Sequence, residues 1–256
     1  MSREQASRYA ETYLHDRGFE EVMVRYRQRL LLDRIALHQP RMVVEIGCGA
    51  DLLYAAWVAR GGTCDRWIIV EPGDQFAAIA RQAELPDLHV VNEYAEHAVA
   101  SVRALAPSPI DMVICSSVLH EVQSPPDLLA AILDLMSAET LLHVNVPNAQ
   151  SFHRRLARSM GLIADTRTMS ERNQRFFHHR VYDLPTLRHE LTAAGLHVVD
   201  AGGHFVKPFT HDQMTQIAPT VGGPVLDGLF QLGREIPELA SEIFVEARKA
   251  AFGSSV

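Results

Sequence analysis

The sequence predicts an α/β protein with a Rossmann-like, doubly wound, mostly parallel sheet. Short segments that are apolar on both faces alternate with helical segments, which is typical of a parallel sheet covered on both sides. A glycine-rich turn follows the first strand directly, where such sheets bind their ligands. With 256 residues, 47% of them hydrophobic, the chain is large enough to bury this sheet in one domain.

The predicted elements follow in a regular order. Residues 3–38 are expected to be helical, up to Pro40. Segments of strand character are 42–46, 66–71, 88–92, 110–116 and 140–146. Helical segments are 51–60, with Asp51 as its N-cap, and 74–85, 125–136 and 183–195. Two last strands, 196–208 and 242–249, are expected to form an antiparallel pair, which gives a seven-stranded sheet with an antiparallel last strand.

Three segments lie outside this alternation. Residues 1–40 are expected to form an N-terminal helical cap, and residues 148–182 a helical lid insertion over the edge of the sheet. Residues 209–240 are expected to form a C-terminal helical insertion. Because no repeat or low-complexity linker separates these parts, residues 1–256 are predicted to be a single domain.

Composition restricts the partners. A net charge of −7 argues against a nucleic-acid binder that relies on phosphate contacts. The cysteines Cys48, Cys64 and Cys115 form no CxxC pair, which argues against a disulfide scaffold or a zinc ribbon. No signal-peptide core and no run of about 18 apolar residues occurs. We therefore expect a cytoplasmic protein, a monomer or homodimer, that contacts neither nucleic acid nor membrane.

The turn VVEIGCGAD, residues 43–51, carries most of the chemical information. Gly47 and Gly49 permit a sharp turn and the close approach of a ligand. Leu52 replaces the third glycine of a dinucleotide fingerprint, and no P-loop motif occurs. The turn therefore predicts a nucleoside site of another kind.

Two carboxylates are predicted to flank this turn. Glu45 precedes Gly47 by two residues, where a carboxylate suits a cationic ligand better than a pyrophosphate. Glu71 ends the second strand, where an acidic side chain accepts hydrogen bonds from ribose hydroxyls. Taken alone, each glutamate is also compatible with a structural role, as a strand-end carboxylate that accepts hydrogen bonds from backbone amides. Together they favour S-adenosyl-L-methionine, whose sulfonium and α-amino groups are positive.

In these motifs the chain resembles the class I S-adenosylmethionine-dependent methyltransferases, in the small-molecule branch that includes the ubiquinone-biosynthesis O-methyltransferases. The resemblance covers about residues 25–206. It rests on VVEIGCGAD, IIVEPGDQF (68–76), VVNEYAEHA (90–98), MVICSSVLHEV (112–122) and the segment 179–208. It implies a small-molecule methyl acceptor, S-adenosyl-L-methionine as cofactor and S-adenosyl-L-homocysteine as product.

The resemblance also implies roles for single residues. The methionine portion of the cofactor would be held by Glu45, Gly47 and Gly49, with Cys48 between the glycines. Further expected cofactor contacts are Glu71 and Pro72 at the ribose, Glu93 and Tyr94 at the adenine, Ser116 and Leu119 near the sulfonium, and Tyr26 and Arg29 at the methionine carboxylate.

Histidines are the predicted catalytic groups, because a hydroxyl acceptor benefits from a general base near neutral pH. His120 follows the fourth strand, close to the expected methyl group, and His178 and His179 lie where the lid insertion returns to the sheet. Each is also compatible with a purely structural role. The chain departs from many relatives here, since His120 precedes Glu121 instead of following an acidic residue. No HxH or HExxH spacing occurs, so no metal is predicted.

The favoured function is methyl transfer to a hydroxyl of a glycosylated or polyketide-like metabolite, by in-line displacement with a histidine base. Arginines crowd the lid insertion, either as solvated charges or as ligands of an acceptor with a carboxylate or phosphate. Three alternatives stay open: an N-methyltransferase acting on an amine or peptide terminus, an NAD-dependent oxidoreductase, and a non-catalytic nucleoside-binding partner subunit.

Overall fold

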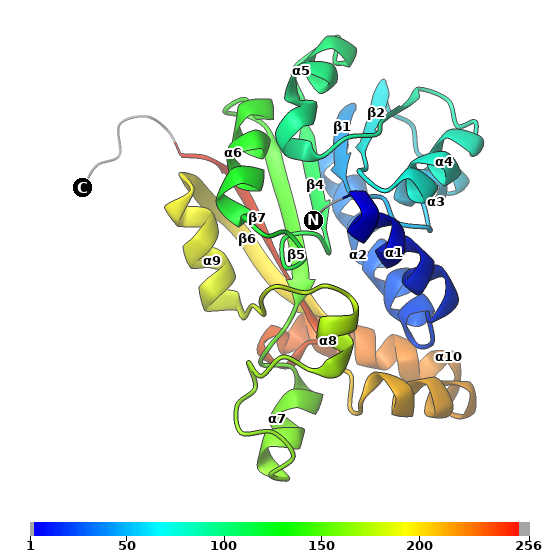
Figure 1. The fold of residues 1–256 in the computed structure, drawn as a ribbon, viewed down its shortest axis with the longest axis vertical. Helices are drawn as coiled ribbons and strands as arrows, with labels where there is room; N and C mark the ends of the chain where they lie inside the picture. Colours follow the sequence, from blue (N-terminus) through cyan, green and yellow to red (C-terminus); the bar gives the residue numbers. More distant parts are fainter. Residues whose placement is uncertain (1–2, 251–256) are drawn as a thin grey trace.

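The computed structural model describes residues 3–250 (Figure 1). Over this range one mixed sheet of seven strands has the order β3-β2-β1-β4-β5-β7-β6. The strands are β1 (Met42–Ile46), β2 (Arg66–Val70), β3 (Leu88–Val91), β4 (Met112–Ser116), β5 (Leu141–Pro147), β6 (Leu196–His204) and β7 (Glu242–Lys249). β1 to β5 pair in parallel, and β7 runs antiparallel to both β5 and β6. The predicted fold class is confirmed.

Helices cover both faces of the sheet. One face carries α5 (Ala95–Leu105), α6 (Pro125–Leu135) and α9 (Leu184–Ala193). The other carries α1 (Arg3–His15), α2 (Glu20–His38), α3 (Leu53–Ala59) and α4 (Asp74–Gln82). Side chains of β1 alternate between the two cores, since Val44 and Ile46 join the first and Val43 the second. Burial of each such side chain contributes about 1.5–3 kcal/mol.

The N-terminal helical segment differs from its prediction. The expected continuous helix over 3–38 is interrupted, because Gly18 takes the left-handed conformation (φ 48°) between α1 and α2. Asp51 forms an ion pair with Arg17 and does not cap α3, whose N-cap residue is Leu52. Helix α5 was not predicted. The break turns α1 back toward α4, against which it packs.

The two insertions contain short or bent helices. Within 148–182 lie α7 (Phe152–Ser159) and α8 (Glu171–Arg175), beyond the carboxyl end of β5 (Figure 1). Within 209–240 lie α10 (His211–Glu235), which bends at Gly222 (φ 74°), and a 3-10 turn, η1 (Pro237–Leu239). α10 packs Met214 and Phe230 against α2 and the β6–β7 pair. No helix within 3–250 has the length and apolar character needed to cross a membrane.

Candidate active site

A cavity of about 1270 Å³ opens at the carboxyl ends of β1, β2 and β4. Its walls are completed by α1, α2, the 148–182 insertion and the segment after β6. Ligands of open α/β sheets bind at this edge, where the chain changes direction between neighbouring strands.

Gly47 shapes the turn after β1. Its φ of 76° lies in the left-handed region, and a Cβ added here would lie 2.6 Å from Cγ2 of Val118. Only glycine therefore lets this turn pass under the loop after β4. Gly49 also has a positive φ, 59°, but an added Cβ would meet nothing within 4 Å. The space beside Gly49 stays free for a ligand.

Backbone amides fix the carboxylate of Glu71 at the tip of β2. Its Oε2 accepts a hydrogen bond from the amide of Cys48 at 3.1 Å, and its Oε1 accepts one from the amide of Gly73 at 2.7 Å. Burial raises the pKa of Glu71, and these amides oppose that shift because they stabilise the ionised form. The result is an oriented acceptor in the cavity wall, suited to the hydroxyls of a ribose.

Glu45 lies in the wall of the same cavity. Its Oε2 accepts a hydrogen bond from Nε1 of Trp67 at 2.8 Å. Burial, and to a lesser extent the charge of Glu71, raises the pKa of Glu45 to about 7. A cation bound beside the two carboxylates would be favoured, because it would compensate charge that water cannot reach. The arrangement fits a nucleoside with a positive centre, such as S-adenosylmethionine.

The remaining predicted cofactor residues divide into two groups. Those that line the cavity are Cys48, Pro72, Tyr94 and Ser116. Glu93 and Leu119 do not line it: Oε1 of Glu93 accepts a hydrogen bond from the amide of Tyr94 at 3.2 Å, and Leu119 lies fully inside the core. Glu96 and His97 line the cavity near Tyr94 instead.

Tyr26 and Arg29 face α10 and not the cavity. The Tyr26 hydroxyl donates to Asp227 at 3.0 Å, and Nη1 of Arg29 binds the same carboxylate at 2.7 Å. Both also contact the ring of Phe230. They were expected at the methionine carboxylate, but their face of α2 packs against α10, so they stabilise that contact. Arg27 of α2 reaches the cavity.

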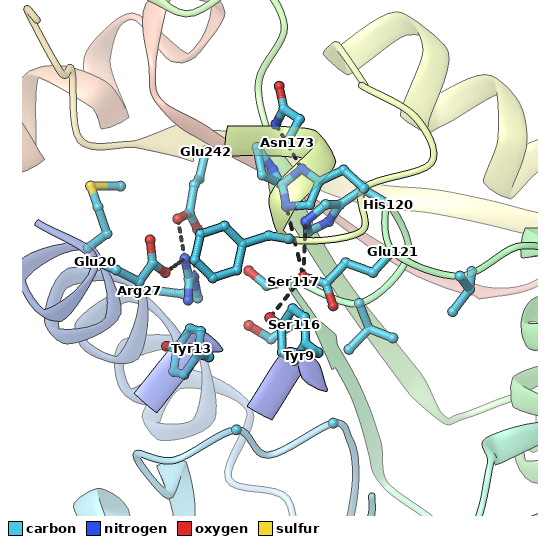
Figure 2. A pocket seen from close by; sticks show the side chains of 18 of the residues that line it. Tyr9, Tyr13, Glu20, Arg27, Ser116, Ser117, His120, Glu121, Asn173 and Glu242 are labelled. Atoms are coloured by element: carbon cyan, nitrogen blue, oxygen red, sulfur yellow. Dashed lines mark hydrogen bonds and ion pairs between the residues drawn. The ribbon is translucent and has the colours of Figure 1, made fainter. Parts of the chain in front are cut away.

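Two of the three predicted catalytic histidines meet in the cavity. Nε2 of His120 lies 3.6 Å from Oε1 of Glu121, and Nε2 of His178 lies 3.9 Å from the same atom. The hydroxyl of Tyr9 donates to this oxygen at 3.0 Å (Figure 2). His179 is exposed and outside the cavity wall; only its backbone amide contributes, by donating to the carbonyl of His120 at 2.9 Å.

Burial sets the charge of this cluster. It lowers the pKa of His120 well below its ordinary range and lowers that of His178 to about 4, because it disfavours the imidazolium form. It raises the pKa of Glu121 to about 8, because it disfavours the carboxylate. Both histidines are therefore neutral at pH 7, as a proton acceptor must be.

Asn173 determines which nitrogen of His178 carries the proton. Its Oδ1 accepts from the amide of Ser170 at 3.0 Å and from the Ser170 hydroxyl at 2.8 Å. Its Nδ2 therefore donates to Nδ1 of His178, 2.8 Å away, which leaves the ring proton on Nε2. His178 in this state is a donor, so His120 is the better candidate for a general base.

The same three side chains have the composition of a metal site. Ligand atoms of His120, Glu121 and His178 lie within 4.8 Å of one another. The sequence spacing did not indicate this group, because His178 comes from a distant segment. A metal ligand needs a lone pair, however, and the tautomer fixed by Asn173 presents an N–H at Nε2 of His178. The group as arranged is suited to hydrogen bonding.

Sequence reasoning missed several residues of the wall. Tyr9 and Tyr13 of α1 stack at 5.9 Å between ring centroids and make edge contacts with Phe76. Arg27 lies between Glu20 and Glu242, at 2.9 Å and 2.5 Å (Figure 2). The i, i+4 spacing of the two tyrosines was a signal that they share one face of α1. Nothing in the sequence indicated that this face covers the cavity.

Arg180 ties the insertion to the loop that carries His120. Its Nη1 donates to the carbonyl of Val122 at 2.8 Å, and its Nη2 to the carbonyl of Gln123 at 2.9 Å. These bonds hold the loop after β4 and the segment of His178 against each other. The cluster around Glu121 therefore depends on both segments being in place.

Comparison with known proteins identifies the family. A model of the family described as "Methyltransferase domain" matches residues 13–201. The chain belongs to this methyltransferase family. It is a class I S-adenosylmethionine-dependent methyltransferase, with S-adenosylmethionine as cofactor, so the earlier alternatives of an oxidoreductase and of a non-catalytic subunit are not retained. No curated protein matches the chain.

Solved structures share the fold of this methyltransferase. The plantazolicin methyltransferase BamL, in complex with a triazolic desmethylPZN analog and SAH, is 13% identical (TM-score 0.57, covering 97% of this chain and 98% of that one). N-methyltransferase NodS from Bradyrhizobium japonicum WM9, in complex with SAH, is 12% identical (0.56; 96% and 99%). The 1,6-didemethyltoxoflavin-N1-methyltransferase of Burkholderia thailandensis is 15% identical (0.55; 98% and 92%). At these identities the likeness concerns the fold.

Proposed function

We propose that this methyltransferase acts on a hydroxyl of a small molecule, with His120 as general base. One observation carries the proposal: neutral His120 lines the same cavity as Glu45 and Glu71, with Glu121 beside it. S-adenosylmethionine supplies an already activated methyl group, so the protein has to align the acceptor and take its proton. Oε1 of Glu121 lies 3.6 Å from Nε2 of His120, so this carboxyl group is placed to accept a hydrogen bond from the imidazolium that His120 becomes.

The size of the cavity supports a bulky acceptor. Its volume of about 1270 Å³ exceeds the roughly 300–1,000 Å³ of most small-molecule sites. The space that remains once the cofactor is bound suits a glycosylated or polyketide-like metabolite. The aromatic side chains of Tyr9, Tyr13 and Phe176 offer apolar surface to such a molecule.

An amine is the second candidate acceptor. Glu121 is a shielded carboxyl group next to two neutral histidines, and above its pKa of about 8 its carboxylate can bind an ammonium group and take its proton. Two of the structures that share this fold are named as N-methyltransferases. An amine must be unprotonated to react, so amine methylation would rise with pH through the pKa of the free amine.

A screen with a labelled methyl donor, using matched hydroxyl and amine acceptors, tests the proposal. We expect turnover of hydroxyl acceptors and a loss of about a hundredfold or more in kcat for His120→Asn. His179→Asn is the control, since its side chain lies outside the cavity, and binding of SAH by calorimetry checks that each variant is intact. Full turnover by His120→Asn, or turnover of amines alone, would contradict the proposal.

We further propose a cytoplasmic location and a monomeric or homodimeric state. Cys48, Cys64 and Cys115 are all free, which agrees with a reducing compartment. Size-exclusion chromatography with light scattering measures the oligomeric state, and a larger assembly would contradict this part of the proposal.

A further inference from the structure

A second part of the cavity wall is lined by cations. Lys207 follows β6, Arg154 belongs to α7 and Arg172 to α8, and all three line the cavity. Burial, and to a lesser extent the charges of Arg172 and Arg154, lowers the pKa of Lys207, while the charges of Glu20 and Glu242 oppose that shift. The 148–182 insertion and the segment after β6 therefore bring three positive charges from distant parts of the chain to one cavity.

Lys207 and Arg172 lack a carboxylate partner. Among residues 3–250, no acidic oxygen lies within the 4.0 Å of an ion pair from either side chain. The carboxylates that influence these two groups lie beyond that distance: Glu20 and Glu242, which are held by Arg27, and Asp16 and Asp212. The guanidinium of Arg172 lies over the ring of Phe176, 4.6 Å from its centroid, which orients it without neutralising it.

Arg154 is fixed by backbone carbonyls. Its Nε donates to the carbonyl of Thr166 at 2.6 Å, and its Nη2 to that of Thr168. Neutral carbonyls orient the guanidinium without an ion pair, and the charge of Asp165 acts on it only from beyond 4.0 Å. Other arginines of the insertion are bound differently: Arg167 pairs with Asp183, and Arg175 with Asp16.

Partly buried cations destabilise the folded chain unless an anion binds beside them. Burial lowers the pKa of Lys207 to about 8 and also lowers the pKa values of Arg154 and Arg172, because water reaches these groups poorly. A bound oxyanion would compensate their charge and accept hydrogen bonds from all three side chains.

We infer that Lys207, Arg154 and Arg172 bind an oxyanion of the methyl acceptor, a phosphate or carboxylate carried away from the methylated atom. The inference rests on the proposed function, because it takes the other wall of the cavity to hold the cofactor. It narrows the acceptors to acidic molecules. The cofactor has a carboxylate of its own, so the experiment has to separate the two sources of negative charge.

Selective acetylation of Lys207 tests the inference on the full chain. Lys207 is one of two lysines in the sequence, and the other, Lys249, lies outside the cavity wall and is an internal control. A neutral acetylating ester is applied with phosphate, acetate or chloride at equal ionic strength, and each lysine is followed by peptide mass spectrometry. When the phosphate concentration is about ten times its dissociation constant, we expect acetylation of Lys207 to be about tenfold slower in phosphate than in chloride. Acetylation of Lys249 is expected to stay unchanged.

The experiment is repeated with saturating SAH. We expect phosphate to protect Lys207 equally well, because the two ligands occupy different parts of the cavity. If SAH alone protects Lys207 and phosphate adds nothing, the anion site belongs to the cofactor and the inference is overturned. Protection no better than in chloride also overturns it. Absence of SAH binding in calorimetry would contradict the assignment of the cofactor wall and is measured separately.

A matched pair of arginine variants completes the test. Arg172→Met is expected to raise the phosphate concentration needed for protection about tenfold, as for the loss of one charge-assisted hydrogen bond. Arg158→Met is the control, since Arg158 is exposed on α7 outside the cavity wall. Equal effects of both variants would overturn the inference. Stronger protection by phosphate than by acetate points to a phosphorylated acceptor, and the reverse order to a carboxylic acid.

Discussion

The two parts of the cavity wall are built in different ways. At the strand tips, Glu71 is fixed by the amides of Cys48 and Gly73, which are close to it in the fold of the central strands. In the insertions, Arg154 and Arg172 are oriented by carbonyls and an aromatic ring of irregular segments. The first part is set by backbone geometry and suits a constant cofactor. The second is set by irregular segments outside the sheet, which can change without disturbing the strands, and so suits a variable acceptor.

Among variants of the strand-tip part, Gly47→Ala is expected to weaken cofactor binding most. The new Cβ would combine a left-handed φ with an approach of 2.6 Å to Val118, so we expect at least about a hundredfold weaker binding of SAH in calorimetry. Gly61→Ala is the control, because Gly61 has φ 80° but nothing within 4 Å of an added Cβ. It should lose about 1–2 kcal/mol of stability and keep its SAH affinity. Equal SAH affinities in the two variants would contradict this role of Gly47.

A milder change is Glu71→Gln. The amide group of glutamine cannot accept from both backbone donors, and it lacks the charge that strengthens hydrogen bonds from the ribose hydroxyls. Binding of SAH is expected to weaken by about 1–3 kcal/mol. Glu139→Gln, at an exposed site, should bind as the unchanged protein does. Unaltered affinity of Glu71→Gln would remove Glu71 from the cofactor site.

Glu121, in the cavity wall beside His120, makes stability depend on pH. Burial raises its pKa from an ordinary 4.5 to about 8, so the folded chain binds more protons than the unfolded chain between these values. This contribution to stability is complete below pH 4.5 and is lost as the pH rises to 8. In the unchanged protein the unfolding free energy decreases as the pH rises over this range. We expect this decrease to be smaller in Glu121→Gln by at least about 1 kcal/mol. Denaturant titrations at several pH values measure it, and an unchanged slope would contradict it.

The smallest expected effect concerns a residue outside both parts. Tyr26→Phe removes the hydrogen bond to Asp227 and should cost about 1 kcal/mol of stability. Because Tyr26 packs against α10, SAH affinity is expected to stay the same. Calorimetry and denaturant unfolding on one preparation give both quantities. A clear drop in SAH affinity would contradict this and support the original expectation that Tyr26 contacts the cofactor.

The same division explains what the sequence could and could not predict. Strands and the turn around Gly47 follow from local patterns, because each apolar run and each glycine acts within a few residues. Glu45 and Glu71 were predictable together, since the tips of neighbouring parallel strands meet at one edge. The break at Gly18 was missed because a single glycine inside a helical pattern is usually tolerated.

The acceptor side was predicted less well for a physical reason. His178 and Lys207 reach the cavity only through the paths of two irregular segments, which depend on tertiary packing. The arginines of the insertion look alike in sequence, yet Arg167 and Arg175 form ion pairs while Arg172 has none. His178 and His179 are adjacent, and the chain turns only one of them inward. Which side chains face the cavity, and which form ion pairs, therefore depends on contacts with residues far away in the sequence.

The hydrogen bonds from Arg180 to the loop after β4 have a consequence for the order of events in a catalytic cycle. If the 148–182 segment moves aside when a bulky molecule enters, this motion draws Arg180 away from the carbonyls of Val122 and Gln123. His120 would then lose the loop support that aligns it. We therefore expect the base to become competent only after the acceptor is enclosed, so that the methyl donor is shielded from water until its intended partner has arrived.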